Sequence, residues 1–302
     1  MRVGVAGCGR WGTKAIREWA TLANEGVITG VDVHDTNTAA LKQAHKIQGV
    51  SRAHTDYDKM LREVDVVHVC VPNERHYSAA MDAIRVGRHV LVEKPLTTNV
   101  QDAQRLRRAA EESKVALAPG HVYRHDATVK YAKDQLAAAW LGKPLYAKAQ
   151  WTAKHDPPTQ WGPVWDLLPH PVDILNDVWG LWPQGWTGSR MGKQAKGAVF
   201  LLAQYAGGPS ASFELSWLDA VRRRCIDFVH ENGVASLDLA GQRFTTHDQN
   251  GLRQASPLPS NTLLAELRWF AAGCKDPARL RWATDAGVGC VRAVEAAAAV
   301  AP

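Results

Sequence analysis

The stretch "VGVAGCGRWG", residues 3–12, decides the fold of the first half of the chain. A short strand-like run leads into Gly7, Gly9 and Gly12 with the spacing GxGxxG, and the helical pattern "TKAIREWATLA" follows directly. In such a turn the first glycine permits the tight bend, the second lets a pyrophosphate approach the backbone, and the third lets the helix pack against the strand. The free N–H groups at the helix start would face the phosphates. The stretch therefore predicts a dinucleotide-binding unit.

An acidic residue follows at the distance that such a unit requires. Asp32 lies twenty residues after Gly12, where we expect the second strand to end and a carboxylate to bind the adenosine ribose hydroxyls. The alternative is a glycine-rich turn with an aspartate that only caps the strand end. Val33 and His34 come next and offer no Lys or Arg to a 2′-phosphate, so the sequence favours NAD over NADP.

The order of elements over the first 120 residues extends this unit. Apolar runs such as "VVHVCV", residues 66–71, alternate with amphipathic stretches such as "VQDAQRLRRAAEE", residues 100–112. Strands that are apolar on both faces are typical of a parallel sheet covered by crossover helices. We predict an α/β fold here, a doubly wound parallel Rossmann sheet over residues 1–120.

The pattern changes in the second half of the chain. From about residue 143 longer strand-like runs follow one another, separated by Gly, Pro or Asn turns without intervening helices. They predict an α+β domain with a large, mainly antiparallel sheet over residues 121–302, and the boundary falls near "APGHVYRHD", residues 118–126. Helical segments at 262–273 and 286–301 close the chain, and the last can pack on either domain.

Composition narrows the class of protein. With 302 residues, of which 46% are hydrophobic and 22% charged, the chain is long enough for two cores. It opens without a basic leader and a long apolar segment, and no apolar run approaches the roughly 18 residues of a membrane span, so we expect a cytoplasmic protein. A net charge of +6 favours anionic ligands such as nucleotides but is too weak to indicate nucleic acid. We interpret the densest basic run, residues 222–224, as a solvated strand face.

The cysteines indicate neither disulfides nor a metal. There are five of them, an odd number, and none forms a CxxC pair. This argues against a disulfide framework and against a structural zinc site. We interpret them as small buried hydrophobic residues and expect no metal.

A second motif, "WDLLPHPVDIL" at residues 165–175, places ionisable groups in an apolar run. Asp166, His170 and Asp173 are spaced by four and three residues, so on a helix they point the same way. The prolines on either side of the histidine place the helix start near Leu168, because proline is tolerated only in the first turn. There the helix dipole disfavours imidazolium, and a side chain with a pKa of about 6.5 suits proton transfer. The alternative is a core histidine with satisfied hydrogen bonds.

Together these motifs resemble the Gfo/Idh/MocA oxidoreductases, which include glucose-fructose oxidoreductase, inositol dehydrogenases and sugar-nucleotide dehydrogenases. The resemblance covers essentially the whole chain. It is most specific at the two stretches quoted above and at "VDVVHVCVPNERHYSAAMDAIRVGRHVLVEKPLTT", residues 64–98, and weaker through the C-terminal sheet. The family's hallmark EKP element is Glu93, Lys94 and Pro95, where the peptide before the proline is commonly cis.

The resemblance implies the catalytic roles. Lys94 would polarise the reacting oxygen, and His170 would act as general base in oxidation and general acid in reduction. Asp166 would orient the imidazole or support its charge. Asp173 would bind a substrate hydroxyl or only be solvated. For Lys94 the alternative is an exposed lysine at a strand end.

The resemblance also implies a cofactor site. Asn73 fits an N-cap of the following helix equally well, and His76 fits an ordinary first-turn residue. Besides the three glycines and Asp32, the expected cofactor residues are Arg10, Trp11, Pro72, Asn73, His76 and Glu93.

For the substrate we expect contacts from Tyr123, Trp165 and Asp173. Arg124 would hold structure, although "RHDA" at 124–127 departs from the family's more usual Arg-Phe-x-Pro. Trp165 and two further tryptophans bracket a loop ahead of the histidine motif, and aromatic faces suit the C–H faces of sugar rings. The alternative is that these rings are core or subunit-interface anchors.

The sequence thus predicts an NAD-dependent oxidoreductase that acts on a secondary alcohol or ketone of a sugar, sugar nucleotide or cyclitol. Neither nucleic acid nor a membrane is an expected partner, whereas a homodimer or homotetramer through the C-terminal sheet is. Two alternatives stay open. One is a redox-neutral, NAD-retaining glycosidase or lyase of the same family type, and the other is a non-catalytic protein that senses NAD or a sugar.

Overall fold

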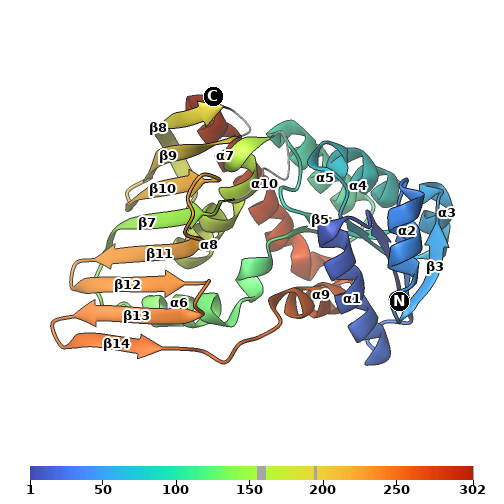
Figure 1. Ribbon diagram of the computed structural model, residues 1–302, viewed down its shortest axis with the longest axis horizontal. Coiled ribbons are helices and arrows are strands. Elements are labelled where there is room, and N and C mark those ends of the chain that lie inside the picture. The colour runs from blue at the N-terminus through green and yellow to red at the C-terminus, as the bar shows by residue number, and fades with distance from the viewer. Residues whose placement is uncertain (155–160, 194–195, 302) are drawn as a thin grey trace. The chain divides into compact units, whose positions relative to one another are not determined.

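The chain folds into two compact units, whose elements are labelled in Figure 1. The computed structural model describes residues 1–154, 161–193 and 196–301. Unit 1 comprises Met1–Val122 and Asn261–Val291, and unit 2 comprises Tyr123–Ser260 and Arg292–Pro302.

Unit 1 is built on a six-stranded parallel sheet with the strand order β3-β2-β1-β4-β5-β6. Its strands are β1 (Arg2–Ala6), β2 (Gly30–His34), β3 (Val50–His54), β4 (Val66–Val69), β5 (His89–Glu93) and β6 (Leu117–Gly120). Its helices before the domain boundary are α1 (Arg10–Asn24), α2 (Thr38–His45), α3 (Tyr57–Glu63), the 3₁₀ turn η1 (Asn73–Arg75), α4 (His76–Arg85) and α5 (Val100–Glu112). This order confirms the predicted doubly wound sheet.

The central strands of this sheet are buried throughout, because crossover helices cover both faces. Every residue of β2 and of β4 is buried, and only the first residue of β1 and of β5 is partly exposed. In a sheet of this order the strand order reverses between β1 and β4, and ligands bind at the carboxyl ends there.

The C-terminal helices correct the expected domain division. The segment 261–291 was assigned to the second domain, but it joins unit 1. The helix α9 (Thr262–Gly273) buries Leu267 and Phe270 in the same core cluster as Trp19 of α1. Burial of large apolar side chains therefore decides the assignment, and sequence order does not. The turn η3 (Pro277–Leu280) and the helix α10 (Arg281–Val300) follow.

Unit 2 contains an eight-stranded sheet with the order β14-β13-β12-β11-β7-β10-β9-β8, which confirms the predicted large, mainly antiparallel sheet. The one parallel pair among its described strands is β7 with β10. The strands are β7 (Pro144–Thr152), β8 (Pro183–Lys193), β9 (Lys196–Tyr205), β10 (Ser210–Ser216), β11 (Arg223–His230), β12 (Gly233–Asp238), β13 (Arg243–Asp248) and β14 (Gly251–Ala255). The helical elements are η2 (Val122–His125), α6 (Ala127–Ala137), α7 (Gly162–Leu167) and α8 (Pro169–Trp179).

One face of this sheet is buried and the other is not. In β9 the side chains of Val199, Leu201 and Ala203 are buried, whereas Phe200 and Leu202 between them are 42% and 58% exposed. The period of two places alternate residues on opposite faces of the sheet. The helices α6 and α7 contact strands of this sheet, and the alternation shows that one face alone is covered.

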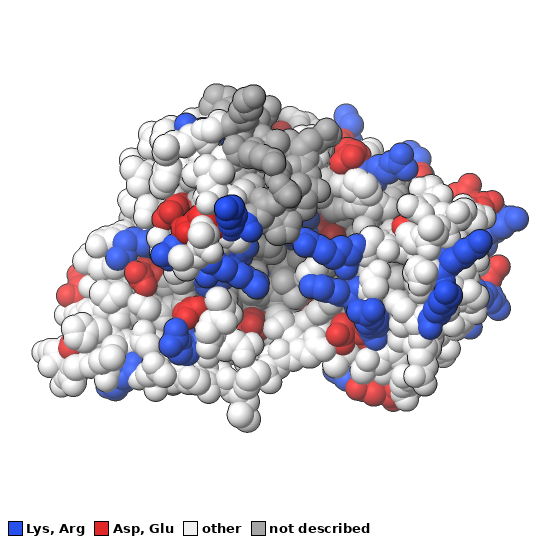
Figure 2. Space-filling model, in the orientation of Figure 1, with Lys and Arg blue, Asp and Glu red and all other residues white. Residues whose placement is uncertain are grey.

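The remaining compositional features agree with an ordinary globular chain. On the face seen in Figure 2, Lys and Arg side chains are interspersed with Asp and Glu. All five cysteines are free thiols, of which Cys8, Cys274 and Cys290 are buried. Among the described residues we find no helix with both the length and the apolar character needed to cross a membrane.

The packing of α9 yields a stability prediction. Phe270→Ala should lower the free energy of unfolding by about 3 kcal/mol, because it empties a fully buried aromatic site. Urea denaturation measures this loss, and hydrogen exchange should speed up in α1, which shares the core cluster. The control Arg268→Ala, on the exposed face of α9, should lower the free energy of unfolding by less than about 1 kcal/mol. Unchanged exchange in α1 would contradict the assignment of α9 to unit 1.

Candidate functional site

The glycine turn has the backbone geometry that a dinucleotide requires. Gly7 has φ +99, and a Cβ there would lie 2.5 Å from the carbonyl oxygen of Cys70. A Cβ on Gly12 would lie 1.8 Å from the carbonyl oxygen of Gly7. Both positions therefore exclude any other residue. A Cβ on Gly9 would meet no described atom within 4 Å, so the backbone there is open to a ligand.

The helix that follows begins directly at this turn. α1 begins at Arg10, and its N-cap Gly9 makes no side-chain capping hydrogen bond. The N–H groups of the first turn and the helix dipole favour an anion at such a terminus. Arg10 and Trp11 are exposed beside it, and the Nζ of Lys14 lies 5.5 Å from the centre of the Trp11 ring. These residues fit a bound pyrophosphate.

The position of Asp32 corrects the sequence prediction. β2 ends at His34, so Asp32 does not close the strand, and its side chain is fully buried. Its two carboxylate oxygens accept from Arg2 Nη1 at 2.7 Å and contact His54 Nε2 at 3.2 Å. A buried carboxylate that already has two partners is not presented to a ribose.

Asp35 occupies the place that was predicted for Asp32. It is the first residue after β2, is half-buried, and accepts a hydrogen bond of 2.6 Å from the backbone N–H of Cys8 in the glycine turn. Its other oxygen accepts from the N–H of Asn37 at 2.7 Å. The polar run "DTN", residues 35–37, directly follows the strand and could have identified Asp35 from the sequence. The spacing of twenty residues from Gly12 pointed to Asp32 instead.

The segment after β4 divides into an exposed part and a buried part. Pro72 is exposed and Asn73 half-exposed, and Asn73 opens η1 without capping it, so the N-cap interpretation is wrong. His76 is buried, with Nδ1 2.7 Å from the carbonyl oxygen of Pro95 and Nε2 3.0 Å from that of Val71. Burial lowers the pKa of His76. This ring links two loops and makes the contacts of a structural residue.

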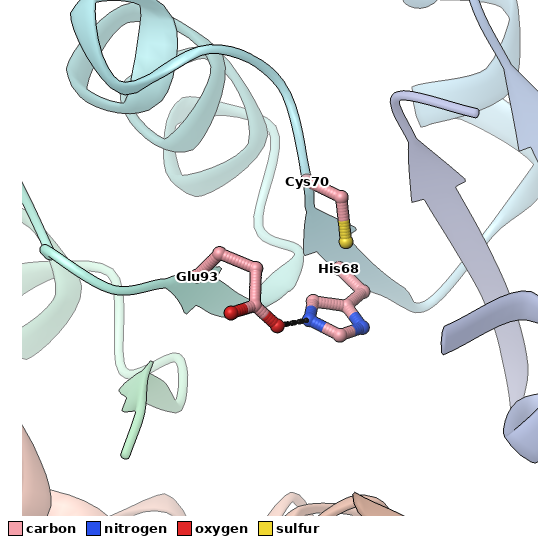
Figure 3. Close-up of side chains that lie close together, drawn as sticks. All are labelled: His68, Cys70 and Glu93. Atoms are coloured by element: carbon pink, nitrogen blue, oxygen red, sulfur yellow. Dashed lines mark hydrogen bonds and ion pairs between the residues drawn. The ribbon is translucent and has the colours of Figure 1, made fainter. Parts of the chain in front are cut away.

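At the end of β5 the EKP element lies at the carboxyl edge of the parallel sheet. The Lys94–Pro95 peptide is cis, and Lys94 is partly exposed. Glu93, in contrast, is buried and accepts a hydrogen bond of 3.0 Å from His68 Nε2 (Figure 3). Cys70 lies beside this pair, and burial with the charge of Glu93 holds the pKa of its thiol well above the ordinary value.

These three side chains could be taken for a metal site. The candidate ligand atoms of His68, Cys70 and Glu93 lie within 4.8 Å of one another. The indole N–H of Trp19, however, donates to His68 Nδ1 at 3.2 Å. The imidazole proton then resides on Nε2, the atom that would have to bind the ion. A protonated Nε2 that donates to Glu93 has no lone pair to offer an ion, so these hydrogen bonds favour a cluster without a metal.

In unit 2 two aromatic side chains lie against the predicted base. His170 lies in the first turn of α8, which begins at Pro169 with Leu168 as N-cap, as predicted. Its ring centre lies 5.0 Å from that of Tyr123, edge to face, and 6.5 Å from that of Trp151. Tyr123 also meets Trp151 edge to face at 5.9 Å. Aromatic packing on two sides fixes the plane of the imidazole, which is partly exposed.

Arg224 belongs to the same cluster, although the sequence indicated a solvated strand face. Its Nη1 donates to the carbonyl oxygen of Thr152 at 3.0 Å, and its guanidinium carbon lies 5.9 Å from the Trp151 ring. It is hydrogen-bonded to Tyr123, whose pKa burial raises and Arg224 lowers. Burial lowers the pKa of Arg224, and the charge of Asp166 acts in the opposite direction, so this carboxylate is close as well. Three successive arginines carry no signal that singles out this one.

Asp173 contradicts its predicted contact with substrate. It is buried, and Arg124 donates to both of its oxygens, with Nη2 2.7 Å from Oδ1. Arg124 also donates to Asn176 at 2.9 Å and to Asp177 at 3.1 Å. The carboxylate therefore anchors η2 to α8. Spacing alone could not separate it from Asp166, because both share a helix face with His170 in the sequence pattern.

The predicted aromatic platform is only partly on the surface. Trp165 is 8% exposed and packs against Trp161 at 5.9 Å, and Trp151 is fully buried. Buried rings favour the alternative that these tryptophans are core anchors. The loop residues 155–160 that they bracket lie outside the described residues.

The fold and the glycine turn are those of a two-unit protein whose Rossmann domain can bind a dinucleotide. Residues 1–121 match the family model GFO_IDH_MocA, described as "Oxidoreductase family, NAD-binding Rossmann fold". This match covers the Rossmann domain of the chain and agrees with the resemblance to the Gfo/Idh/MocA oxidoreductases.

Similar proteins agree with this assignment. The UDP-N-acetylglucosamine 3-dehydrogenase of Acidithiobacillus ferrooxidans is 31% identical over 175 residues, which are 58% of this chain and 53% of that protein. The chain thus matches about half the length of the curated relatives. A crystal structure of the same dehydrogenase has a TM-score of 0.87 at 23% identity and covers 99% of this chain and 98% of its own. A 3-ketoreductase from Actinomadura kijaniata, in complex with TDP-benzene and NADP, has a TM-score of 0.86 at 20% identity, with 100% and 98% covered.

The contacts of Asp173 yield a prediction for this site. Asp173→Asn should lower the free energy of unfolding by about 3 kcal/mol, because the guanidinium of Arg124 is left buried without its main counter-charge. The affinity for NAD should stay unchanged, since Asp173 binds Arg124 within unit 2 and the glycine turn belongs to unit 1. Chemical denaturation and a cofactor titration measure the two quantities. If the variant is as stable as the wild type but fails to turn over substrate, Asp173 binds substrate and the structural interpretation is wrong.

Proposed function

We propose that the protein is an NAD(P)-dependent oxidoreductase, with NAD preferred, that acts on a secondary alcohol or the matching ketone of a sugar, sugar nucleotide or cyclitol. The observation that carries the proposal is the open glycine turn at the start of α1, next to a sheet edge that also carries Lys94. The similarity to the UDP-N-acetylglucosamine 3-dehydrogenase named above supports the substrate class. A cytoplasmic location stays a prediction of the sequence.

In this proposal each residue has one task. Lys94 donates a hydrogen bond to the substrate oxygen and stabilises the negative charge that develops there. His170 accepts the hydroxyl proton in oxidation and returns it in reduction. Tyr123 and Trp151 hold the imidazole plane, and Asp166 supports the imidazolium charge. Bound NAD(P) supplies the acceptor or donor of the hydride at the same carbon.

Asp35 takes over the ribose contact that the sequence assigned to Asp32. Its carboxylate is half-buried at the glycine turn and still has accepting capacity beyond the Cys8 and Asn37 N–H groups. A negative charge in this place also repels a 2′-phosphate, which supports the preference for NAD. The backbone of His76 and the carboxylate of Glu93 would then border the nicotinamide half of the cofactor.

Association of two or four chains through the sheet of unit 2 is also part of the proposal. Besides Phe200 and Leu202, the exposed large apolar residues on the same face of this sheet are Tyr146, Met191 and Leu252. An uncovered sheet face with this many apolar side chains is typical of an interaction surface. Such a contact would bury the exposed side chains of Phe200 and Leu202 on β9.

The role of His170 is tested by removing the base. His170→Ala should lower turnover by roughly 10² to 10⁴ while the dissociation constant of NAD stays nearly the same. Turnover is read from NADH absorbance with a panel of polyols, sugars and nucleotide sugars. The matched control is His45→Ala, an exposed histidine on α2, which should keep full activity. Full activity of His170→Ala would refute the assigned role.

The same panel separates the rival functions. Consumption of substrate without net NADH would identify a redox-neutral enzyme that retains its cofactor. Tight NAD binding without turnover of any compound would favour a sensor.

The cofactor preference is tested at the two aspartates. Asp35→Ala should raise the dissociation constant of NAD about tenfold, because the variant removes a charge-assisted hydrogen-bond acceptor. The ratio of the dissociation constants of NADP and NAD should become smaller, because the charge that repels a 2′-phosphate is also removed. Asp32→Asn should instead lower stability and leave the ratio of the two dissociation constants unchanged. Titration of each protein with both nucleotides, followed by tryptophan fluorescence, gives these constants. An unchanged ratio in Asp35→Ala would exclude this residue from the ribose site.

A further inference from the structure

Three side chains from three elements form a buried hydrogen-bonded row in unit 1. Trp19 of α1 and His68 of β4 are fully buried, and Glu93 at the end of β5 is 8% exposed. Trp19 Nε1 donates to His68 Nδ1 at 3.2 Å, and His68 Nε2 lies 3.0 Å from Glu93 Oε1, as Figure 3 shows for the second contact. The Trp19 and His68 rings are edge to face, with their planes at 80°.

This row fixes the protonation of the histidine. An indole N–H can only donate, so Nδ1 of His68 must accept with its lone pair. The single proton of the neutral ring is then on Nε2 and points at the carboxylate. An imidazolium would set a second N–H against the indole N–H, which is unfavourable in a buried site. Trp19 thus selects the tautomer in which His68 donates to Glu93.

Glu93 is constrained from its other side as well. A Cβ on Gly120 of β6 would lie 3.1 Å from Glu93 Oε2, so the glycine leaves room for the carboxylate and little more. The carboxylate therefore has one orientation, set by a donor on β4 and by the backbone of β6. The next residue in the chain is Lys94.

We propose that His68 is a positioning residue of the cofactor site, which acts by orienting the Glu93 carboxylate beside Lys94. The inference deepens the proposed function and rests on it. A purely structural histidine would affect stability alone. Replacing a buried polar pair by apolar groups can even be neutral for stability, so an effect on cofactor binding distinguishes the two roles.

The substitutions follow from the hydrogen bonds. His68→Leu removes both the acceptor for Trp19 and the donor for Glu93. His68→Gln keeps an acceptor and a donor in one side chain. His68→Leu should raise the dissociation constant of NAD about tenfold, and His68→Gln should stay within about threefold of wild type.

A double-mutant cycle with Glu93→Gln shows whether His68 acts through the carboxylate. In the Glu93→Gln background, the addition of His68→Leu should change NAD affinity by less than about twofold. The same tenfold loss in that background would overturn the proposal. Failure of the wild-type protein to bind NAD would overturn the proposed function and, with it, this cofactor role, whereas normal wild-type binding with additive losses would overturn only the role of His68.

A second readout needs no cofactor. In the ¹⁵N spectrum of the protein, the imidazole of His68 should be neutral with its proton on Nε2, and Trp19→Phe should release this restriction. A proton on Nδ1 in the wild type would overturn the proposal. Stoichiometric binding of Zn²⁺ with loss of the Nε2–H signal would also overturn it and assign a metal site instead.

Discussion

The close backbone approach at the glycine turn is the constraint on which the rest of unit 1 depends. The carbonyl oxygen of Gly7 and the Cα of Gly12 come so near that no side chain fits, and the strand therefore passes directly into α1. This brings the uncapped start of α1 to the carboxyl edge of the sheet. A helix terminus, an open backbone at Gly9 and the edge of a parallel sheet then coincide, and all three favour an anionic nucleotide.

Burial and partners, and not spacing, decide which carboxylates are available for chemistry. Asp32 and Asp173 stand at the sequence positions that predicted functional residues, yet both are buried and each forms an ion pair with an arginine. Asp35 and Asp166 are partly exposed and close to the glycine turn and to the His170 cluster respectively. A carboxylate held by a guanidinium stabilises the fold only while the pair is intact. The same residue type therefore performs two tasks in each unit.

The row Trp19, His68 and Glu93 places polar groups among the largely apolar central strands β4 and β5. A histidine in the middle of a buried parallel strand is tolerated because both ring nitrogens have partners. Trp19 sets the tautomer of His68, because an indole N–H can only donate a hydrogen bond. Hydrogen bonding thus links the helix after the glycine turn to the residue that precedes Lys94.

The sequence by itself determined the alternation of elements, the glycine turn and the first-turn position of His170, because these follow from local periodicity and from turn chemistry. The tertiary structure alone decided that α9 joins unit 1, that Arg224 contacts Tyr123 and Trp151, and that Asp35 replaces Asp32 at the turn. Each of these outcomes depends on contacts between residues far apart in the chain. Periodicity along the sequence reports which face a side chain occupies, whereas burial and hydrogen-bond partners are set only when distant segments meet.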